Sequence, residues 1–290
     1  MLFRSRTIQS RADLEALPKG MDDFYKVIFN QRFPAASTNS ALQPLLGLLC
    51  VKQQPLGYRE LAAMAQVSED QISDCLEPIA DLLRFQLSPD SDGSTFNDDD
   101  WRISFDHVSL EQWLTARSDG PFRRYRAGRF AVDPDTAKEQ IHTWALAEVQ
   151  AGRAHTWPYL VRHLASHLKD DERAEVIGGQ LLQFPWLQAR LKLAGLTALL
   201  GDFNPTQYEP NTLPPEAIPL ERALRQAAHV LSHEEGWNGQ EQLASQLLAR
   251  LPEGAMPQGL ELQARDWLHK AGGARPRAAS LVGQIGRAHV

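Results

Sequence analysis

Two pairs of histidines have the four-residue spacing that could place both side chains on one metal ion. His163 and His167 fall on one predicted helix, and His229 and His233 repeat the spacing. Neither pair has an identifiable third ligand, and no glutamate follows His163 where a metal-assisted general base would stand. The sequence therefore favours histidines that lie on helices without binding a metal, and we expect no metal site in this chain.

Four arginines form the strongest basic cluster of the chain, at Arg123, Arg124, Arg126 and Arg129. Aromatic residues are interleaved with them, so the cluster could bind a phosphate group or RNA. The alternative is a connector whose arginines pair with acidic groups on neighbouring helices or on the tip of a hairpin. The sequence favours the connector and leaves the arginines as a candidate interaction patch.

His107 follows a strand-like segment at 101–105 and precedes a predicted helix at 109–116. A side chain at such a junction points away from the sheet edge and could reach a neighbouring domain. The simpler alternative is a surface histidine beside a helix cap formed by Ser109. Replacing His107 in the chain alone is expected to leave its stability almost unchanged.

Motifs that hold nucleotides or carry nucleophiles are missing. The sequence has no Gly-x-x-x-x-Gly-Lys-[Ser/Thr] loop, no Gly-x-Gly-x-x-Gly after a strand and no Gly-x-Ser-x-Gly elbow. We therefore assign no catalytic residue, expect no cofactor in this chain and do not expect it to be an enzyme by itself.

Composition places the chain among ordinary globular proteins. Its 290 residues suggest two domains, and its net charge of −6 argues against coating nucleic acid or an anionic membrane. The two cysteines, Cys50 and Cys75, exclude a disulfide framework and are expected to be buried thiols of a cytoplasmic protein. The longest apolar run, 42–51, is too short to cross a bilayer.

The first part of the chain reads as a winged-helix domain over 18–116. Ser68 begins a helix with Gln71 three residues later, which is a capping-box pattern. The expected helices lie at 21–33, 40–51, 58–65 and from 68 onward, with a closing helix at 109–116. A hairpin is expected between them, with strands at 84–87 and 101–105, a polar tip at 88–100 and a turn at 92–93.

The second helix of this predicted helix–turn–helix is unsuited to DNA. It carries five acidic residues and a single terminal base, Arg84. Affinity for DNA comes mainly from lysine and arginine at the phosphates, so this helix would be repelled. A winged-helix transcription regulator with a helical effector domain remains an alternative function, as does a stand-alone helical scaffold that binds proteins.

The rest of the chain predicts a helical array, so the expected fold class is mainly α, with stacked helical hairpins after the winged helix. The expected divisions are a basic connector at 117–132, a helical arm at 133–202, a proline-rich loop at 203–219, further helices at 220–269 and a flexible tail at 270–290.

The order of several segments resembles bacterial signalling ATPases of the STAND class, in particular NACHT-like members that carry WD repeats. The segment at 17–25 is similar to the one that follows their ATPase core, and 55–62 and 76–83 resemble their winged helix. The segment 107–114 looks like the "H-x-S-F-x-x-W-L" end of that domain. Segments of the helical region also resemble theirs, at 159–168, 186–191, 228–231 and 242–251.

The resemblance implies a regulatory segment that couples nucleotide state to a C-terminal sensor such as a WD-repeat propeller. ATP and ADP would bind the ATPase domain of the parent protein, which could assemble as a homo-oligomer in the ATP state. The implied partners are intramolecular, with no nucleic acid and no membrane. In related switches a winged-helix histidine contacts the ADP phosphate, and His107 occupies the matching place, although Val108 stands where relatives often have aspartate.

The resemblance also implies that the chain is a fragment, in which 1–17 lead out of a missing ATPase core. Residues 285–290 back-translate to ATC GGA AGA GCA CAC GTC, which resembles a sequencing-library adapter. We therefore expect that the natural sequence departs from this one near Gln284.

Overall fold

The computed structural model describes residues 20–34, 40–88, 101–116, 126–208, 212–232, 239–251 and 257–270. These residues are mainly helical and include one small antiparallel sheet, which confirms the expected mainly-α class. The chain divides into two compact units, 1–144 and 145–290, which are described separately below.

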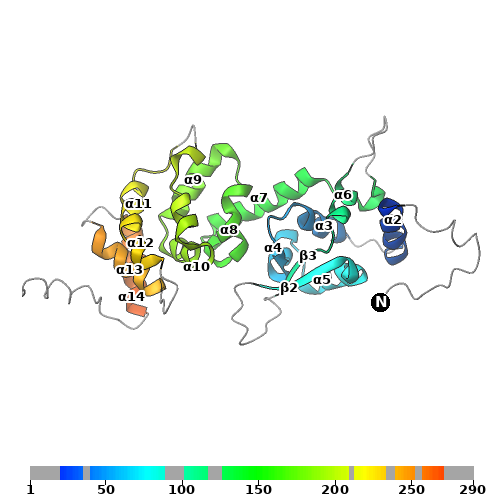
Figure 1. Ribbon diagram of the computed structural model, residues 1–290, viewed down its shortest axis with the longest axis horizontal. Helices are drawn as coiled ribbons and strands as arrows, with labels where there is room; N and C mark the ends of the chain where they lie inside the picture. The colour runs from blue at the N-terminus through cyan, green and yellow to red at the C-terminus, as the bar shows by residue number, and fades with distance from the viewer. Residues whose placement is uncertain are drawn as a thin grey trace, which may run out of the picture. The chain divides into compact units, whose positions relative to one another are not determined.

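The first unit surrounds the sheet with short helices (Figure 1). Its elements are α2 (Met21–Arg32), α3 (Leu42–Val51), β1 (Leu56–Gly57), α4 (Tyr58–Ala65), α5 (Glu69–Leu76), the 3-10 segment η2 (Glu77–Leu82), β2 (Leu83–Leu87), β3 (Trp101–Phe105), α6 (Val108–Thr115) and η4 (Gly128–Phe130).

The sheet has the strand order β1-β3-β2, with both pairings antiparallel. Leu83 lies opposite Phe105 and Leu87 opposite Trp101, so the expected hairpin strands pair in register. Strand β1, whose two residues pair with β3, was not expected from the sequence. The expected turn at 92–93 lies outside the described residues.

Local sequence signals explain the helices that precede the hairpin. Gln66 adopts the left-handed conformation, at φ 56°, and ends α4. Ser68 then caps α5 by accepting a hydrogen bond from the Gln71 backbone N–H at 3.2 Å, and the Gln71 side chain returns one from the Ser68 N–H. Pro78 lies in η2, the 3-10 segment that directly follows α5, and the helical backbone is kinked at the next residue, Ile79, where φ is −117° and ψ is 17°.

An aromatic cluster joins α2 and α6 to the segment after α6. Phe29 lies at its centre, with ring centroids 5.1 Å from Trp113 and 5.2 Å from Phe130. Phe130, 2% exposed, belongs to the segment that the sequence analysis treated as a connector. The buried ring packs η4 onto the first unit, so the two units divide further along the chain, inside α7 (Pro134–Gln150).

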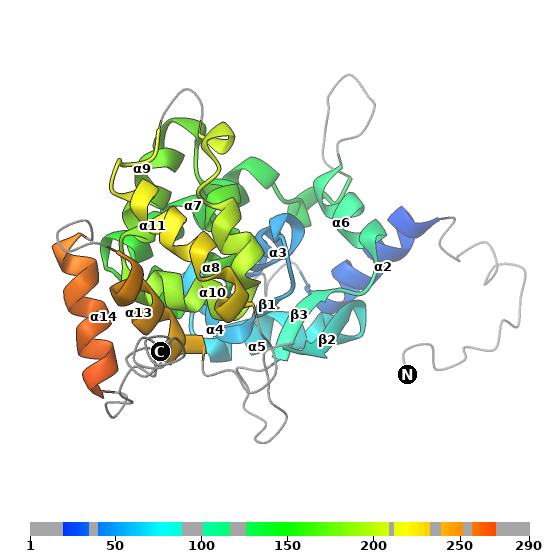
Figure 2. The ribbon, with the colours of Figure 1, turned by 60° about the vertical axis from the view of Figure 1, so that its left-hand side comes forward.

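The second unit contains helices and 3-10 turns, and no strand among its described residues. Its elements are η5 (Ala154–Thr156), α8 (Pro158–His167), α9 (Asp170–Leu181), α10 (Phe184–Gly201), η6 (Pro205–Gln207), α11 (Ala217–Gln226), α12 (Ala228–Leu231), α13 (Gly239–Arg250) and α14 (Gln258–Lys270). Helices α13 and α14 lie side by side (Figure 2).

Helix α10 is broken at Gly195, where φ is 81° and ψ is 169°. In a straight helix Arg190 and Asp202, twelve residues apart, would lie about 18 Å apart along the axis. Instead the Arg190 guanidinium forms two hydrogen bonds to the Asp202 carboxylate, at 2.7 and 2.8 Å. The break therefore brings the C-terminal end of α10 next to Arg190 in its first half.

We predict that Gly195→Ala destabilises the protein by about 1–3 kcal/mol, because only glycine readily adopts this backbone conformation. Gly179→Ala is the matched control. That glycine lies inside α9 with no atom near the added methyl group, so alanine should stabilise by about 0.5–1 kcal/mol. Urea unfolding of both variants measures the difference, and equal effects would contradict the assigned break.

Within the described residues, no helix combines the length and the apolar character needed to cross a membrane. The tail expected at 1–17 and the adapter-like end at 285–290 both fall outside the described residues.

Candidate functional site

His107 is the N-cap residue of α6. Its ring Nδ1 accepts a hydrogen bond from the Ser109 backbone N–H at 3.1 Å and lies 2.7 Å from the Ser109 hydroxyl oxygen. The extended backbone at His107, with φ −136° and ψ 135°, is typical of an N-cap. The cap of α6 is therefore formed by the histidine ring and not by Ser109, the cap residue expected from the sequence.

A hydrogen-bond chain connects this ring to α2. The Ser109 hydroxyl lies 2.7 Å from the Tyr25 hydroxyl, and Tyr25 is 3% exposed. The Tyr25 ring also packs against Trp113 of α6, with ring centroids 5.7 Å apart. Tyr25 therefore fixes the α2–α6 contact beside His107. Sequence reasoning missed this partner because it lies 84 residues from Ser109 in the chain.

The cap determines which ring nitrogen of His107 carries the proton. A backbone N–H can only donate, so Nδ1 must accept and the neutral ring carries its proton on Nε2. His107 is exposed, and Nε2 makes no hydrogen bond within the described residues. The ring thus offers one hydrogen-bond donor to a group outside this unit.

We predict that His107→Ala destabilises the chain alone by about 0.5–2 kcal/mol, since alanine cannot cap α6. This replaces the expectation of almost no effect, which ignored the ring's bond to the backbone. His107→Asn should cost much less, because an asparagine side chain is a good cap. Urea unfolding compares the two, and a neutral alanine variant would contradict the capping role.

The arginine cluster is split between described and undescribed residues. Arg126 lies 3.2 Å from the Asp22 carboxylate in α2, and Arg129 binds the Phe33 backbone carbonyl while its guanidinium lies over the Phe130 ring. Both arginines are thus tied to the end regions of α2, as in the connector interpretation. Arg123 and Arg124 lie outside the described residues.

The histidines of α8 are not brought together with further ligands. His167 Nε2 lies 2.8 Å from the Tyr159 hydroxyl. Burial lowers the pKa of His163, and the neighbouring Arg162 and Arg190 lower it further. No group of three or more metal-ligating side chains occurs in the described part of the chain, which covers His229 but not His233.

The cysteines also lack features of a reactive site. Burial raises the pKa of the Cys50 thiol to about 12, and Glu111 adds to the increase. Burial likewise raises the pKa of Cys75. Since the thiolate is the nucleophile, both groups are protonated and unreactive near neutral pH.

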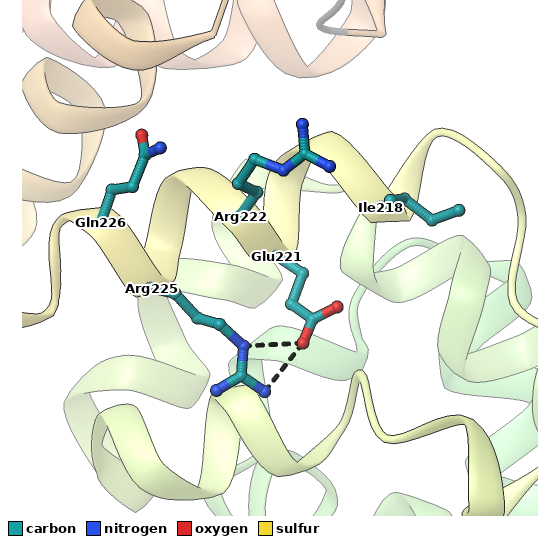
Figure 3. Close-up of a pocket in the computed structure, with 5 residues that line it drawn as sticks. All are labelled: Ile218, Glu221, Arg222, Arg225 and Gln226. Carbon is teal, nitrogen blue, oxygen red and sulfur yellow. Dashed lines mark hydrogen bonds and ion pairs between the residues drawn. The ribbon is translucent and has the colours of Figure 1, made fainter.

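A hollow of about 670 Å³ lies on α11 of the second unit, lined by Ile218, Glu221, Arg222, Arg225 and Gln226 (Figure 3). Arg225 and Glu221 form an ion pair across one helical turn, with the nearest atoms 2.8 Å apart. All five side chains belong to one helix, and Arg222 points away from the ion pair (Figure 3). The hollow is an open helix surface without the convergent polar groups typical of an active site.

Comparison of the chain with protein-family models, with curated proteins and with solved structures finds no match.

Proposed function

We propose that this chain is a non-catalytic regulatory segment of a STAND-class, NACHT-like signalling ATPase. It would couple the nucleotide state of the ATPase domain to a C-terminal sensor such as a WD-repeat propeller. The observation that carries the proposal is the His107 cap of α6, which leaves a hydrogen-bond donor on an exposed ring. The resemblance implies that related switches contact ADP from the matching position.

The order of elements in the first unit supports a winged helix. Helix α3 is followed by β1, helices α4 and α5, and then the β2–β3 hairpin. The third strand, β1, adds an element that winged helices share and that the sequence reading lacked. The helices of the second unit are, in the same proposal, the helical arm with stacked hairpins.

The proposed contact is a hydrogen bond from His107 Nε2–H to an ADP phosphate oxygen. This donor is already oriented in the absence of nucleotide, because the Ser109 N–H holds the other ring nitrogen. A preoriented donor loses little conformational freedom when it binds a phosphate. ADP would thereby favour the closed state in the cytoplasmic parent protein.

Tyr25 gives the proposed switch a mechanical connection. Helix α2 begins within the segment 17–25, which resembles the one that follows the ATPase core in the STAND class. If α2 moves in the open state, the Tyr25–Ser109 hydrogen bond breaks, and the His107 ring loses the support that Tyr25 gives through the Ser109 hydroxyl. Nucleotide state and the orientation of His107 would then be coupled in both directions.

We predict that the chain alone does not bind ATP or ADP at micromolar concentrations, because one histidine donor is a small part of a nucleotide site. Isothermal titration calorimetry measures this. The ATPase-containing parent protein should bind ADP in the same assay. Micromolar binding by the chain alone, lost on mutation of a local residue, would overturn the proposal.

The alternative of a DNA-binding regulator has a separate test. The carboxylates of α5 at Glu69, Asp70 and Asp74 are exposed, so the helix would meet the phosphates with like charge. A mobility-shift assay at low salt should show no binding to DNA. Saturable, salt-dependent binding to a duplex would favour the regulator instead.

A further inference from the structure

One face of the β2–β3 hairpin extends beyond the hydrophobic core. At the inner end of the hairpin, Leu83 and Phe105 lie opposite each other and are buried. At the outer end, Leu87 lies opposite Trp101, and these side chains are 41% and 38% exposed. Phe85, on the same face, is 39% exposed. The hairpin therefore presents an apolar, partly aromatic surface to solvent.

This surface forms one wall of a groove. The groove is an open hollow of about 950 Å³, lined by Tyr58, Glu69, Asp70, Ser73, Phe85 and Trp101. The opposite wall is the first turn of α5, where the side chains of Glu69 and Asp70 are exposed. Aromatic rings and carboxylates thus face the same space from different elements.

The groove is negatively charged. Its described lining residues include two carboxylates, Glu69 and Asp70, and no lysine or arginine. Within the described residues, neither Glu69 nor Asp70 has an ion-pair partner. An anionic ligand would be repelled here, whereas a cation would be attracted.

We propose that this groove binds an arginine-bearing linear segment of a partner protein. A guanidinium is planar and weakly hydrated, so it can stack on an aromatic ring and bind a carboxylate at the same time. In the groove it would lie against Trp101 or Phe85 and bind Glu69 and Asp70. A neighbouring aliphatic side chain of the segment would cover Leu87. This inference does not depend on the proposed ATPase function.

The test uses the full chain and the synthetic peptide acetyl-Gly-Arg-Leu-Arg-Gly-amide. Calorimetry and the indole N–H resonance of Trp101, assigned with Trp101→Phe, report binding. We expect saturable binding that shifts the Trp101 resonance and weakens with salt. Replacing both arginines of the peptide by citrulline, which keeps the shape and removes the charge, should weaken binding about tenfold or more.

Two double variants separate the groove from the general charge of the protein. Glu69→Gln with Asp70→Asn should weaken binding of the arginine peptide about tenfold or more. Asp74→Asn with Glu77→Gln removes the same charge from exposed sites outside the groove lining and should retain wild-type affinity.

Several outcomes would overturn the proposal. If both double variants lose the same affinity for the arginine peptide, the attraction is nonspecific. If the citrulline peptide binds as tightly as the arginine peptide, the groove binds an apolar ligand and not a guanidinium. Absence of saturable binding up to about 1 mM peptide would also overturn it. A Trp101 resonance that shifts only with protein concentration would overturn it too, because the groove would then bind a second copy of this chain.

Discussion

In the full-length parent protein, replacing His107 with alanine is expected to shift the closed–open equilibrium toward the open form by about 10- to 150-fold. A hydrogen bond from the ring to a charged phosphate contributes about 1.5–3 kcal/mol, and the proposed contact exists only in the closed state. Removing it therefore lowers the stability of that state alone. The variant should release ADP faster and assemble without its trigger, which stopped-flow release of a fluorescent ADP analogue would measure.

The capping role of His107 requires a second variant. Alanine removes both the cap of α6 and the proposed phosphate donor. Asparagine keeps a cap and, because its side chain is shorter, loses the donor at the Nε2 position. We therefore expect His107→Asn to release ADP nearly as fast as His107→Ala while unfolding like the wild type. If His107→Asn keeps the wild-type affinity for ADP, His107 does not sense the nucleotide and its only role is to cap α6.

Arg190→Leu is expected to destabilise the protein by about 3–5 kcal/mol. Arg190 and Asp202 form a bidentate ion pair in which the side chains are 12% and 10% exposed. The guanidinium also donates to the backbone carbonyl of Val161 at 2.7 Å. Loss of the arginine would leave a buried carboxylate and a buried carbonyl without this partner. Removing one partner of a buried ion pair typically lowers the free energy of unfolding by about 3–5 kcal/mol. Chemical denaturation measures the change.

Two controls identify the buried carboxylate as the cause. Arg225→Leu removes an arginine from an exposed pair on α11 and should cost less than about 1 kcal/mol. Burial raises the pKa of Asp202, and Arg190 opposes that increase, so the carboxyl in Arg190→Leu should protonate at higher pH than in the wild type. The difference in stability between Arg190→Leu and the wild type should then decrease as the pH is lowered, because a protonated Asp202 needs no ion-pair partner. A stability difference that does not change with pH would indicate that lost packing, and not the unpaired carboxylate, is the cause.

Signals contained within a few residues were sufficient to predict local structure. The Ser68–Gln71 capping box was recognisable because both partners lie within one helical turn. The β2–β3 hairpin was recognisable from alternating side chains. Strand β1 was not, since two residues carry no periodicity and become a strand only by pairing with β3.

Features that depend on distant contacts could not be predicted in this way. Gly195 lies in an apolar run that predicts an unbroken helix, and its break is stabilised by the contact between Arg190 and Asp202. The candidate site shows the same limit. His107 was identifiable from its place between strand and helix, but the capping bond of its ring and the support from Tyr25 depend on the packing of α2 against α6.

The most direct test of the proposed function is the sequence of the genomic DNA that flanks the coding region. The proposal predicts an open reading frame that continues upstream into an ATPase domain with a Gly-x-x-x-x-Gly-Lys-[Ser/Thr] loop, and downstream into a repeat-containing sensor. In-frame stop codons directly before Met1 and directly after Val290 would contradict it, because the chain would then be a complete protein without an ATPase to regulate.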